Sequence, residues 1–331
     1  MERGAALACR ASAIQCNRMA PMVVELTHSS HSDLLAIPLF FAVQSLPDPK
    51  EINATSISLW AGAILDHLVE HFGEAPPSWS LSIFEPDSCV TGKKFARQSR
   101  IEESLLESLR KKRRAYLRTL KDSPSSSDTI VQVLAITPEH GYISIADPET
   151  RQIYGASLPL SYAGFSSIDD DKRPPSRAFK KLLEAIDLFA LPVKKGQTAV
   201  DLGASPGGWT YVMRQLGITV TAIDRAPLDH SLSRNKGVVC LTGDALSWRP
   251  DKAVDWMICD VITAPTNTAK LIQSWVAGSL CRNFCVTVKF KGEPDFDTLV
   301  KLSAFLKSSC SWFDARQLTN NKNELTVVGR M

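Results

Sequence analysis

The second half of the chain alternates between segments typical of strands and segments typical of helices, and this alternation constrains the fold most strongly. Short apolar runs predict five buried strands, at 198–202, 218–224, 237–244, 254–260 and 284–290. Helical spacing of apolar residues predicts four helices around them, at 176–191, 209–216, 267–280 and 296–309. Such alternation predicts an α/β protein with a parallel, doubly wound sheet. Ser176 is placed to cap the first of these helices.

The last two apolar runs, 312–318 and 324–329, are separated only by the polar turn TNNKN. A turn of this composition between two strand-like runs predicts a hairpin. We expect it to add an antiparallel edge to the parallel sheet.

The first 160 residues predict an α+β region. Strand-like runs lie at 79–84, 129–137 and 141–146, and helix-like segments lie at 56–72 and 101–121. Two stretches have the composition of linkers, DSPSSSD at 122–128 and GFSSIDDDKRPP at 164–175. The second ends in two prolines, which block helix continuation. We therefore predict an accessory region over 1–163, a linker over 164–175 and a second domain over 176–331.

Composition excludes several classes of protein. The net charge is +3, and the longest apolar stretch, Leu34 to Val43, is interrupted by Pro38 and too short to span a membrane. Eight cysteines in 331 residues do not predict a disulfide framework. Cys281 and Cys285 are predicted to be buried thiols and not metal ligands, because no partner pair follows them. We expect no metal and no membrane partner.

The first 22 residues contain arginines and few acids, a composition also found in transit peptides. They lack the continuous apolar core of a secretory signal. Whether this segment targets the protein to an organelle stays open, and the expected location is the cytoplasm.

The stretch DLGASPGGWT at 201–210 predicts a cofactor site. It places a glycine turn between a strand and a helix, where the backbone can approach a ligand closely. A dinucleotide site would offer free amides to a pyrophosphate, but Pro206 removes one of them. Asp224, Asp244 and Asp260 each close a further strand. An acidic rim repels phosphates and suits a cationic ligand with a ribose, such as S-adenosylmethionine.

Two other interpretations of this stretch remain open. The glycines can simply make a turn while the acids simply end strands. The chain can also be a dinucleotide oxidoreductase, which Pro206 and the acidic rim disfavour.

Several motifs together resemble the FtsJ-like ribose 2'-O-methyltransferases, and most closely their RlmM branch. The motifs are PSRAFKKLLEA (175–185), DLGASPGGWT, GDAL (243–246), WMICD with the following valine (256–261), VKFKGE (288–293) and ARQLTNNKNELTVV (315–328). The resemblance is continuous over about 174–331. It implies a Rossmann-like S-adenosylmethionine-dependent methyltransferase fold with an antiparallel C-terminal strand. It also implies that the substrate is a cytidine ribose in large-subunit ribosomal RNA.

In the first 160 residues the resemblance is carried by WSLSIFEPDS and the GYISIA region. These look similar to the RNA-binding front of the RlmM branch, which contains a THUMP domain. The resemblance therefore implies a THUMP-like accessory region.

The family's Lys-Asp-Lys-Glu tetrad falls on Lys181, Asp260, Lys289 and Glu324. Lys180 precedes the first member, and the spacing from the SRA motif favours Lys181. The resemblance also implies contacts to the methyl donor at Ser176, Gly203, Ser205, Pro206, Gly207, Gly208, Trp209, Asp224, Asp244 and Asp260. Two departures are mild, because Ser205 stands where the branch often has cysteine and Thr287 stands where asparagine is expected.

A ribose 2'-hydroxyl becomes a good nucleophile only as its proton leaves, so the reaction needs a base. A lysine serves as a base only when neutral, and lowering its pKa from about 10.4 to about 7 corresponds to about 4 kcal/mol. A neighbouring ammonium group and partial desolvation both lower a lysine pKa. We expect Lys289 to be the base, Lys181 to lower its pKa, Asp260 to orient it and Glu324 to position Lys181 and the ribose.

The segment 93–121 predicts an RNA-binding surface. It contains eleven basic and three acidic residues, a net charge of +8, within a helical pattern of apolar residues. A run of charges also occurs on solvated helix faces, so this interpretation depends on the methyltransferase half. Alternatives that keep the fold are methylation of transfer RNA or an mRNA cap, and a non-catalytic RNA-binding protein. The oligomeric state stays open.

Overall fold

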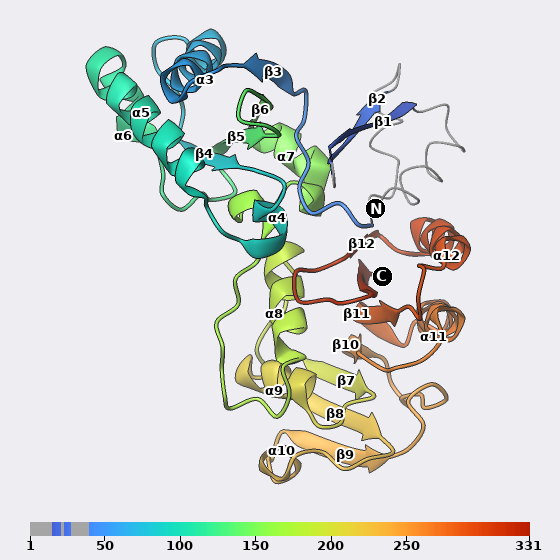
Figure 1. The fold of residues 1–331 in the computed structure, drawn as a ribbon. Helices are drawn as coiled ribbons and strands as arrows, with labels where there is room; N and C mark the ends of the chain where they lie inside the picture. Colours follow the sequence, from blue (N-terminus) through green and yellow to red (C-terminus); the bar gives the residue numbers. More distant parts are fainter. Residues whose placement is uncertain (1–14, 21–22, 28–39) are drawn as a thin grey trace. The chain divides into compact units, whose positions relative to one another are not determined.

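The computed structural model describes residues 15–20, 23–27 and 40–331, which form two compact units (Figure 1). Among these residues, the first unit comprises 15–20, 23–27 and 42–167, and the second comprises 40–41 and 168–331. The division after Ser167 falls inside the linker predicted at 164–175. The other predicted linker, 122–128, lies within the first unit. Most of the segment compared with transit peptides, and most of the apolar stretch at 34–43, lie outside the described residues.

The second unit is built on a seven-stranded sheet in the order β12-β13-β11-β10-β7-β8-β9 (Figure 1). Its strands are β7 (Thr198–Leu202), β8 (Thr219–Asp224), β9 (Val238–Thr242), β10 (Val254–Cys259), β11 (Cys281–Lys289), β12 (Trp312–Arg316) and β13 (Glu324–Arg330). The ladders joining β11, β10, β7, β8 and β9 are parallel. The strand β13 pairs antiparallel with both of its neighbours. The predicted antiparallel C-terminal strand is confirmed.

The predicted antiparallel edge is confirmed too, because the β12–β13 hairpin forms one end of the sheet. The edge strand is β12, and β13 lies between it and β11. Six of the seven residues of β13 are buried, whereas β12 begins with an exposed residue and two half-buried ones. A strand that is buried on both faces belongs inside a sheet.

Helix α8 (Phe179–Leu188) precedes the strands of the second unit, and four further helices connect them. These are α9 (Gly208–Gln215), α10 (His230–Ser233), α11 (Pro265–Ala277) and α12 (Phe296–Ser309). The core on the α11 and α12 side contains Met257, Trp275, Phe284 and Leu302, all at most 2% exposed. The prediction that Ser176 caps the first helix is wrong. The cap position is Ala178, which makes no side-chain cap hydrogen bond, because residues 177 and 178 turn before the helix begins.

The first unit contains a four-stranded sheet in the order β3-β6-β5-β4. Its strands are β3 (Lys50–Asn53), β4 (Trp79–Phe84), β5 (Thr129–Ala135) and β6 (His140–Ala146). Its α-helices are α3 (Ile57–Phe72), α4 (Ser88–Thr91), α5 (Ala96–Lys112), α6 (Arg114–Thr119) and α7 (Pro148–Tyr154). The antiparallel pair β1 (Gln15–Ala20) and β2 (Val23–Thr27) precedes them. The arrangement is α+β, and its THUMP-like identity stays a prediction.

The single helix predicted over 101–121 is in fact two helices, α5 and α6, separated at Arg113 (φ −147°, ψ 59°). The break directs Tyr116 into the core, where it is fully buried. Its carbonyl accepts the Trp79 indole N–H at 3.0 Å, and its hydroxyl donates to the carbonyl of Gly73. Burial of these two aromatic rings outweighs the continuity of the helix.

The two cysteines of the CRNFC stretch are buried, as predicted. Cys281 and Cys285 lie in β11 as buried free thiols. Burial raises the pKa of the Cys281 thiol to about 12, which keeps it protonated. No group of residues in the described part of the chain could hold a metal ion. None of its helices is both long and apolar enough to cross a bilayer.

Candidate functional site

The carboxyl edge of the second unit's sheet gathers most of the predicted site residues. The parallel strands β7, β8, β10 and β11 all end at this edge, and Asp224, Asp260 and Lys289 lie at or directly after their ends. Because β13 runs antiparallel, its first residue lies at the same edge. Lys289 and Glu324 are direct partners in the β11–β13 ladder. The antiparallel strand therefore places an acid beside a lysine that lies 35 residues earlier in the chain.

The four residues predicted to form the tetrad lie in one connected cluster. Lys181 Nζ contacts Glu324 Oε1 and lies 3.3 Å from Asp260 Oδ2. Lys289 Nζ lies 3.0 Å from Asp260 Oδ1 and donates a 2.6 Å hydrogen bond to the Asp260 carbonyl oxygen. Asp260 thus lies between the two lysines.

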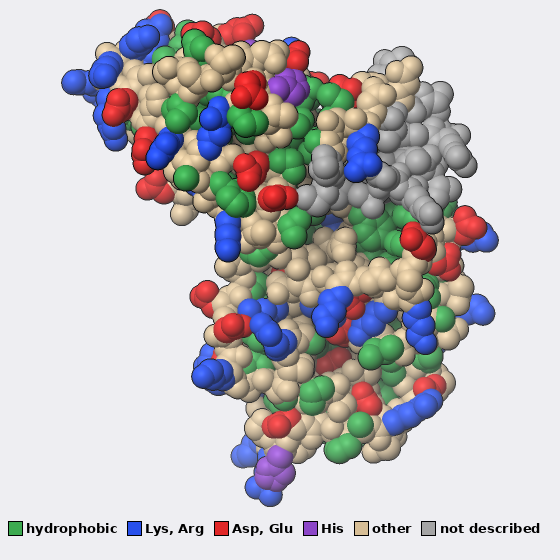
Figure 2. Space-filling model, in the orientation of Figure 1, with side chains coloured by type: hydrophobic (Ala, Val, Ile, Leu, Met, Phe, Trp, Pro, Cys, Tyr) green, Lys and Arg blue, Asp and Glu red, His purple; other side chains and the backbone are tan. Residues whose placement is uncertain are grey.

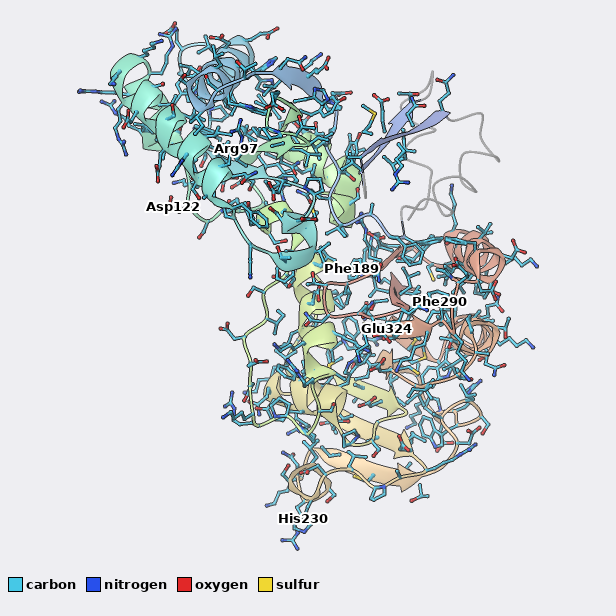
Figure 3. All side chains as sticks on the ribbon, in the orientation of Figure 1. Arg97, Asp122, Phe189, His230, Phe290 and Glu324 are labelled. Atoms are coloured by element: carbon cyan, nitrogen blue, oxygen red, sulfur yellow. The ribbon has the colours of Figure 1, made fainter. Side chains whose placement is uncertain are left out.

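These four side chains are largely shielded from water. Their exposed fractions are 14% for Lys181, 14% for Asp260, 19% for Lys289 and 8% for Glu324. Partial burial strengthens interactions between charges, because less water screens them. In Figure 3 the labels of Glu324 and of Phe290, the residue that follows Lys289, mark where this cluster lies.

Lys180 and Lys181 have different partners. Lys180 Nζ lies 2.6 Å from Asp170 Oδ1 and donates to the Ile168 carbonyl at 2.9 Å, so it contacts the linker segment. Lys181, the next residue on α8, contacts Asp260 and Glu324. The sequence spacing that favoured Lys181 selects the lysine that lies in the cluster.

The glycine turn has the backbone that only glycine adopts readily. Gly203 has φ +75° and Gly207 has φ +118°, both in the left-handed region. A Cβ atom on Gly203 would lie 3.0 Å from Val261 Cβ, and one on Gly207 would collide with Leu232. Gly207 is the residue before α9, so the turn leads directly into the start of that helix.

Ser176 and Trp209 pack against this turn. Ser176 Oγ occupies the space where a Cβ of Gly208 would lie, which explains the glycine at that position. The Trp209 ring is 3% exposed, and its indole N–H donates to the Ala178 carbonyl at 2.9 Å. The Trp209 ring therefore joins α9 to the start of α8. The predicted contact of Trp209 with the methyl donor depends on its backbone, because the buried ring is not available for it.

Two of the predicted donor-site acids already have partners. Asp224 accepts backbone N–H groups from Ser205 and Ala226, each at 2.9 Å and each on a different carboxylate oxygen. Each oxygen keeps one lone pair for a further donor. Asp244 accepts from Ser247 Oγ at 2.9 Å and from Arg225 at 2.7 Å. The Ser247 hydrogen bond, with a smaller contribution from Arg225, lowers the pKa of Asp244.

Asp201 lies beneath the site, and sequence reasoning assigned it no separate role. It is 1% exposed in β7, and its Oδ2 accepts the Thr210 hydroxyl at 2.6 Å. Burial raises the pKa of Asp201 to about 7, and the nearby Asp260 and Asp224 carboxylates add to the rise. An acid inside an otherwise apolar strand is the sequence signal that could have marked it.

Two further contacts were also missed. Glu184, in the first predicted helix, accepts hydrogen bonds from the backbone of Thr319 and Asn320. The sequence signal for it was a charged residue among apolar neighbours. Phe40 packs in the core of the second unit, and its carbonyl accepts the Gln317 N–H at 2.8 Å. Phe40 is far from the site in sequence, so no local pattern could have placed it there.

Comparison with known families defines the class. Residues 174–306 match the FtsJ-like methyltransferase family. The resemblance predicted from the motifs is confirmed, and these residues form an FtsJ-like methyltransferase domain. With its central sheet, the second unit has a mixed α/β methyltransferase fold.

The individual relatives to which the chain is similar include several that carry the name of the RlmM branch. The chain is 31% identical over 220 residues to "Ribosomal RNA large subunit methyltransferase M" of Marinobacter nauticus, covering 62% of this chain and 59% of that protein. It is 36% identical over 164 residues to the protein of the same name in Azoarcus sp., covering 46% of this chain and 45% of that protein. The Pseudomonas putida GB-1 protein of that name is 40% identical over 133 residues, covering 38% of this chain and 37% of that protein. The chain thus matches about three fifths or less of the length of these relatives.

Proposed function

We propose that this protein transfers a methyl group from S-adenosylmethionine to a ribose 2'-hydroxyl in RNA. The observation that carries the proposal is the cluster of Lys181, Asp260, Lys289 and Glu324 at the sheet edge that also bears the glycine turn. The named relatives act on large-subunit ribosomal RNA, which supports the same substrate here. We further propose a cytidine ribose as the target, as the resemblance to the RlmM branch implies.

The residues around the glycine turn fit a phosphate-free cationic nucleoside. The turn has left-handed backbone at Gly203 and Gly207, and Pro206 supplies no N–H for a phosphate. Asp224 has lone pairs available for ribose hydroxyl groups, and Asp260 follows β10 at the same edge. Ser205 and Gly208 would complete the contact surface. When bound, S-adenosylmethionine supplies an electrophilic methyl group.

Within the tetrad, Lys289 is proposed as the general base that takes the 2'-hydroxyl proton. The Asp260 carbonyl and carboxylate fix its Nζ in place. Lys181 holds the hydroxyl oxygen, and Glu324 holds Lys181 through their ion pair. Alignment matters because an in-line displacement needs the reacting atoms about 3 Å apart. The strands and α8 that carry these side chains supply that alignment.

The basic surface of α5 and α6 is proposed to bind RNA phosphates. Figure 2 shows basic side chains gathered over these helices. Arg110, Lys111, Lys112, Arg114 and Arg118 are all exposed there. The apolar side chains of the same segment, such as Leu105 and Leu109, are fully buried, so the helices present their charge outward. Such a surface attracts RNA with a strong dependence on salt.

The direct test is transfer of labelled methyl groups to RNA. The purified protein with labelled S-adenosylmethionine should label large-subunit ribosomal RNA, and mapping should place the 2'-O-methyl group on one cytidine. Comparison of total RNA from cells with and without the gene should show the loss of that same modification. Labelling of a base, or of transfer RNA alone, would contradict the proposed substrate.

A further inference from the structure

Glu184 is a buried acid one helical turn beyond Lys181 on α8. It is 2% exposed. Its carboxylate accepts three hydrogen bonds from the connection between β12 and β13. Thr319 N donates to Oε1 at 2.6 Å, and Asn320 N and Asn320 Nδ2 donate to Oε2 at 2.9 and 2.7 Å. A carboxylate buried this deeply is stable there because these donors replace water.

The connection that Glu184 holds, residues 317–323, leads directly to the tetrad. Its last residue, Asn323, donates to the carbonyls of Phe290 at 3.2 Å and Gly292 at 2.6 Å. The Phe290 N–H returns a 2.9 Å hydrogen bond to the Asn323 carbonyl. The loop thus attaches to the strand end that carries Lys289.

The same loop also contacts Glu324 itself. The Lys322 N–H donates to Glu324 Oε1 at 3.3 Å, the oxygen that also contacts Lys181. Asn321 Nδ2 donates to the Glu324 carbonyl at 3.3 Å. The orientation of the Glu324 carboxylate therefore depends on where this loop lies.

We propose that Glu184 is a positioning residue of the methyl-transfer site, which acts by fixing the 317–323 loop and through it Glu324. Residues three apart on a helix lie on the same face, so α8 presents Lys181 to Glu324 and Glu184 to the loop that carries Glu324. One helix thereby sets the distance between the two members of the Lys181–Glu324 pair. This inference rests on the proposed function.

The test compares Glu184→Gln with Asp187→Asn. Glutamine has nearly the same shape, but donors face both carboxylate oxygens of Glu184, so in either orientation the Nε2 faces at least one donor and at least one hydrogen bond is lost. Asp187 lies on the same helix, is exposed, and serves as the matched control. We expect Glu184→Gln to lower kcat at least tenfold while the Kd for S-adenosylmethionine changes less than twofold. Asp187→Asn should leave both constants unchanged.

A compensating variant separates positioning from general destabilisation. In Glu184→Gln with Asn320→Asp, the new amide can donate to the new carboxylate, so part of the contact is restored. We expect kcat to recover at least threefold relative to Glu184→Gln alone. Unchanged kcat in Glu184→Gln, or no recovery in the double variant, would overturn the positioning role.

Hydrogen exchange of residues 318–325 in the same variants supplies a readout independent of activity. Faster exchange is expected in Glu184→Gln and not in Asp187→Asn. Absence of methyl transfer by the unaltered protein would contradict the proposed function, whereas unchanged exchange would contradict the anchoring of the loop by Glu184.

Discussion

Replacing Asp201 by asparagine should change how the stability of the second unit depends on pH. Asparagine keeps an oxygen that can accept the Thr210 hydroxyl but carries no charge. Burial raises the pKa of Asp201 from 3.8 to about 7, and a shift of about 3 units corresponds to about 4 kcal/mol. Because asparagine does not titrate, the substitution removes this pH-dependent contribution of Asp201 to the free energy of unfolding.

The sign follows from proton binding. Between pH 4 and 7 the unfolded chain has lost the Asp201 proton while the folded protein keeps it, so the folded state binds more protons. The contribution of Asp201 to the free energy of unfolding is therefore largest at low pH. It falls as the pH rises through this window and is constant above about pH 7. From pH 5 to pH 8 we expect the free energy of unfolding of Asp201→Asn to rise relative to wild type by about 3 kcal/mol.

The assay is hydrogen exchange of the β7 and β8 amides, corrected for the intrinsic exchange rate at each pH. These amides report opening of this sheet separately from the first unit. Asp251→Asn, at an exposed position of the second unit, is the control and should follow wild type at every pH. Parallel pH profiles for Asp201→Asn and wild type would refute the claim that Asp201 is protonated in the folded protein below pH 7.

Two further predictions concern the ligands. Replacing the exposed basic residues Arg110, Lys111, Lys112 and Arg114 by glutamine should weaken the salt dependence of RNA binding. The slope of log K against log salt should flatten by up to about 3, since each phosphate contact contributes about 0.7 to 0.9. An unchanged slope in a filter-binding titration would show that these side chains are only solvated and do not contact RNA. Gly207→Ala should weaken S-adenosylmethionine binding at least tenfold in calorimetry, because φ +118° and the Leu232 side chain both exclude a Cβ. Gly196→Ala, which has φ +88° but nothing near its Cβ, controls for backbone strain and should bind normally.

Local patterns predicted most of the second unit, because most of its strands are short apolar runs. The run at 198–202 coincides with β7. The tetrad was assigned from motifs. Asp260 and Lys289 meet because parallel strands end at one edge, Glu324 joins them because the antiparallel β13 begins there, and Lys181 reaches them from α8. The hairpin edge was predicted, but the sequence did not show which of its two strands lies outermost, since that depends on which run is buried on both faces in the assembled sheet.

Contacts between distant residues account for the rest of what the sequence could not predict. The three donors to Glu184 lie more than 130 residues later in the chain. The helix break at Arg113 depends on Tyr116 meeting Trp79, which no propensity encodes. Ser176 has the composition of a helix cap, yet it packs against Gly208 instead, because the helix starts two residues later than the pattern predicts.

The most direct test of the account is single-turnover methyl transfer by Lys289→Ala, measured beside Lys291→Ala, an exposed lysine two residues further on. General-base catalysis contributes about 10²- to 10⁴-fold, so the rate for Lys289→Ala should fall by at least two orders of magnitude. Its affinity for S-adenosylmethionine should stay within a few fold, and Lys291→Ala should transfer methyl groups at the wild-type rate. A Lys289→Ala rate within tenfold of wild type would contradict the proposal that this amine takes the ribose proton.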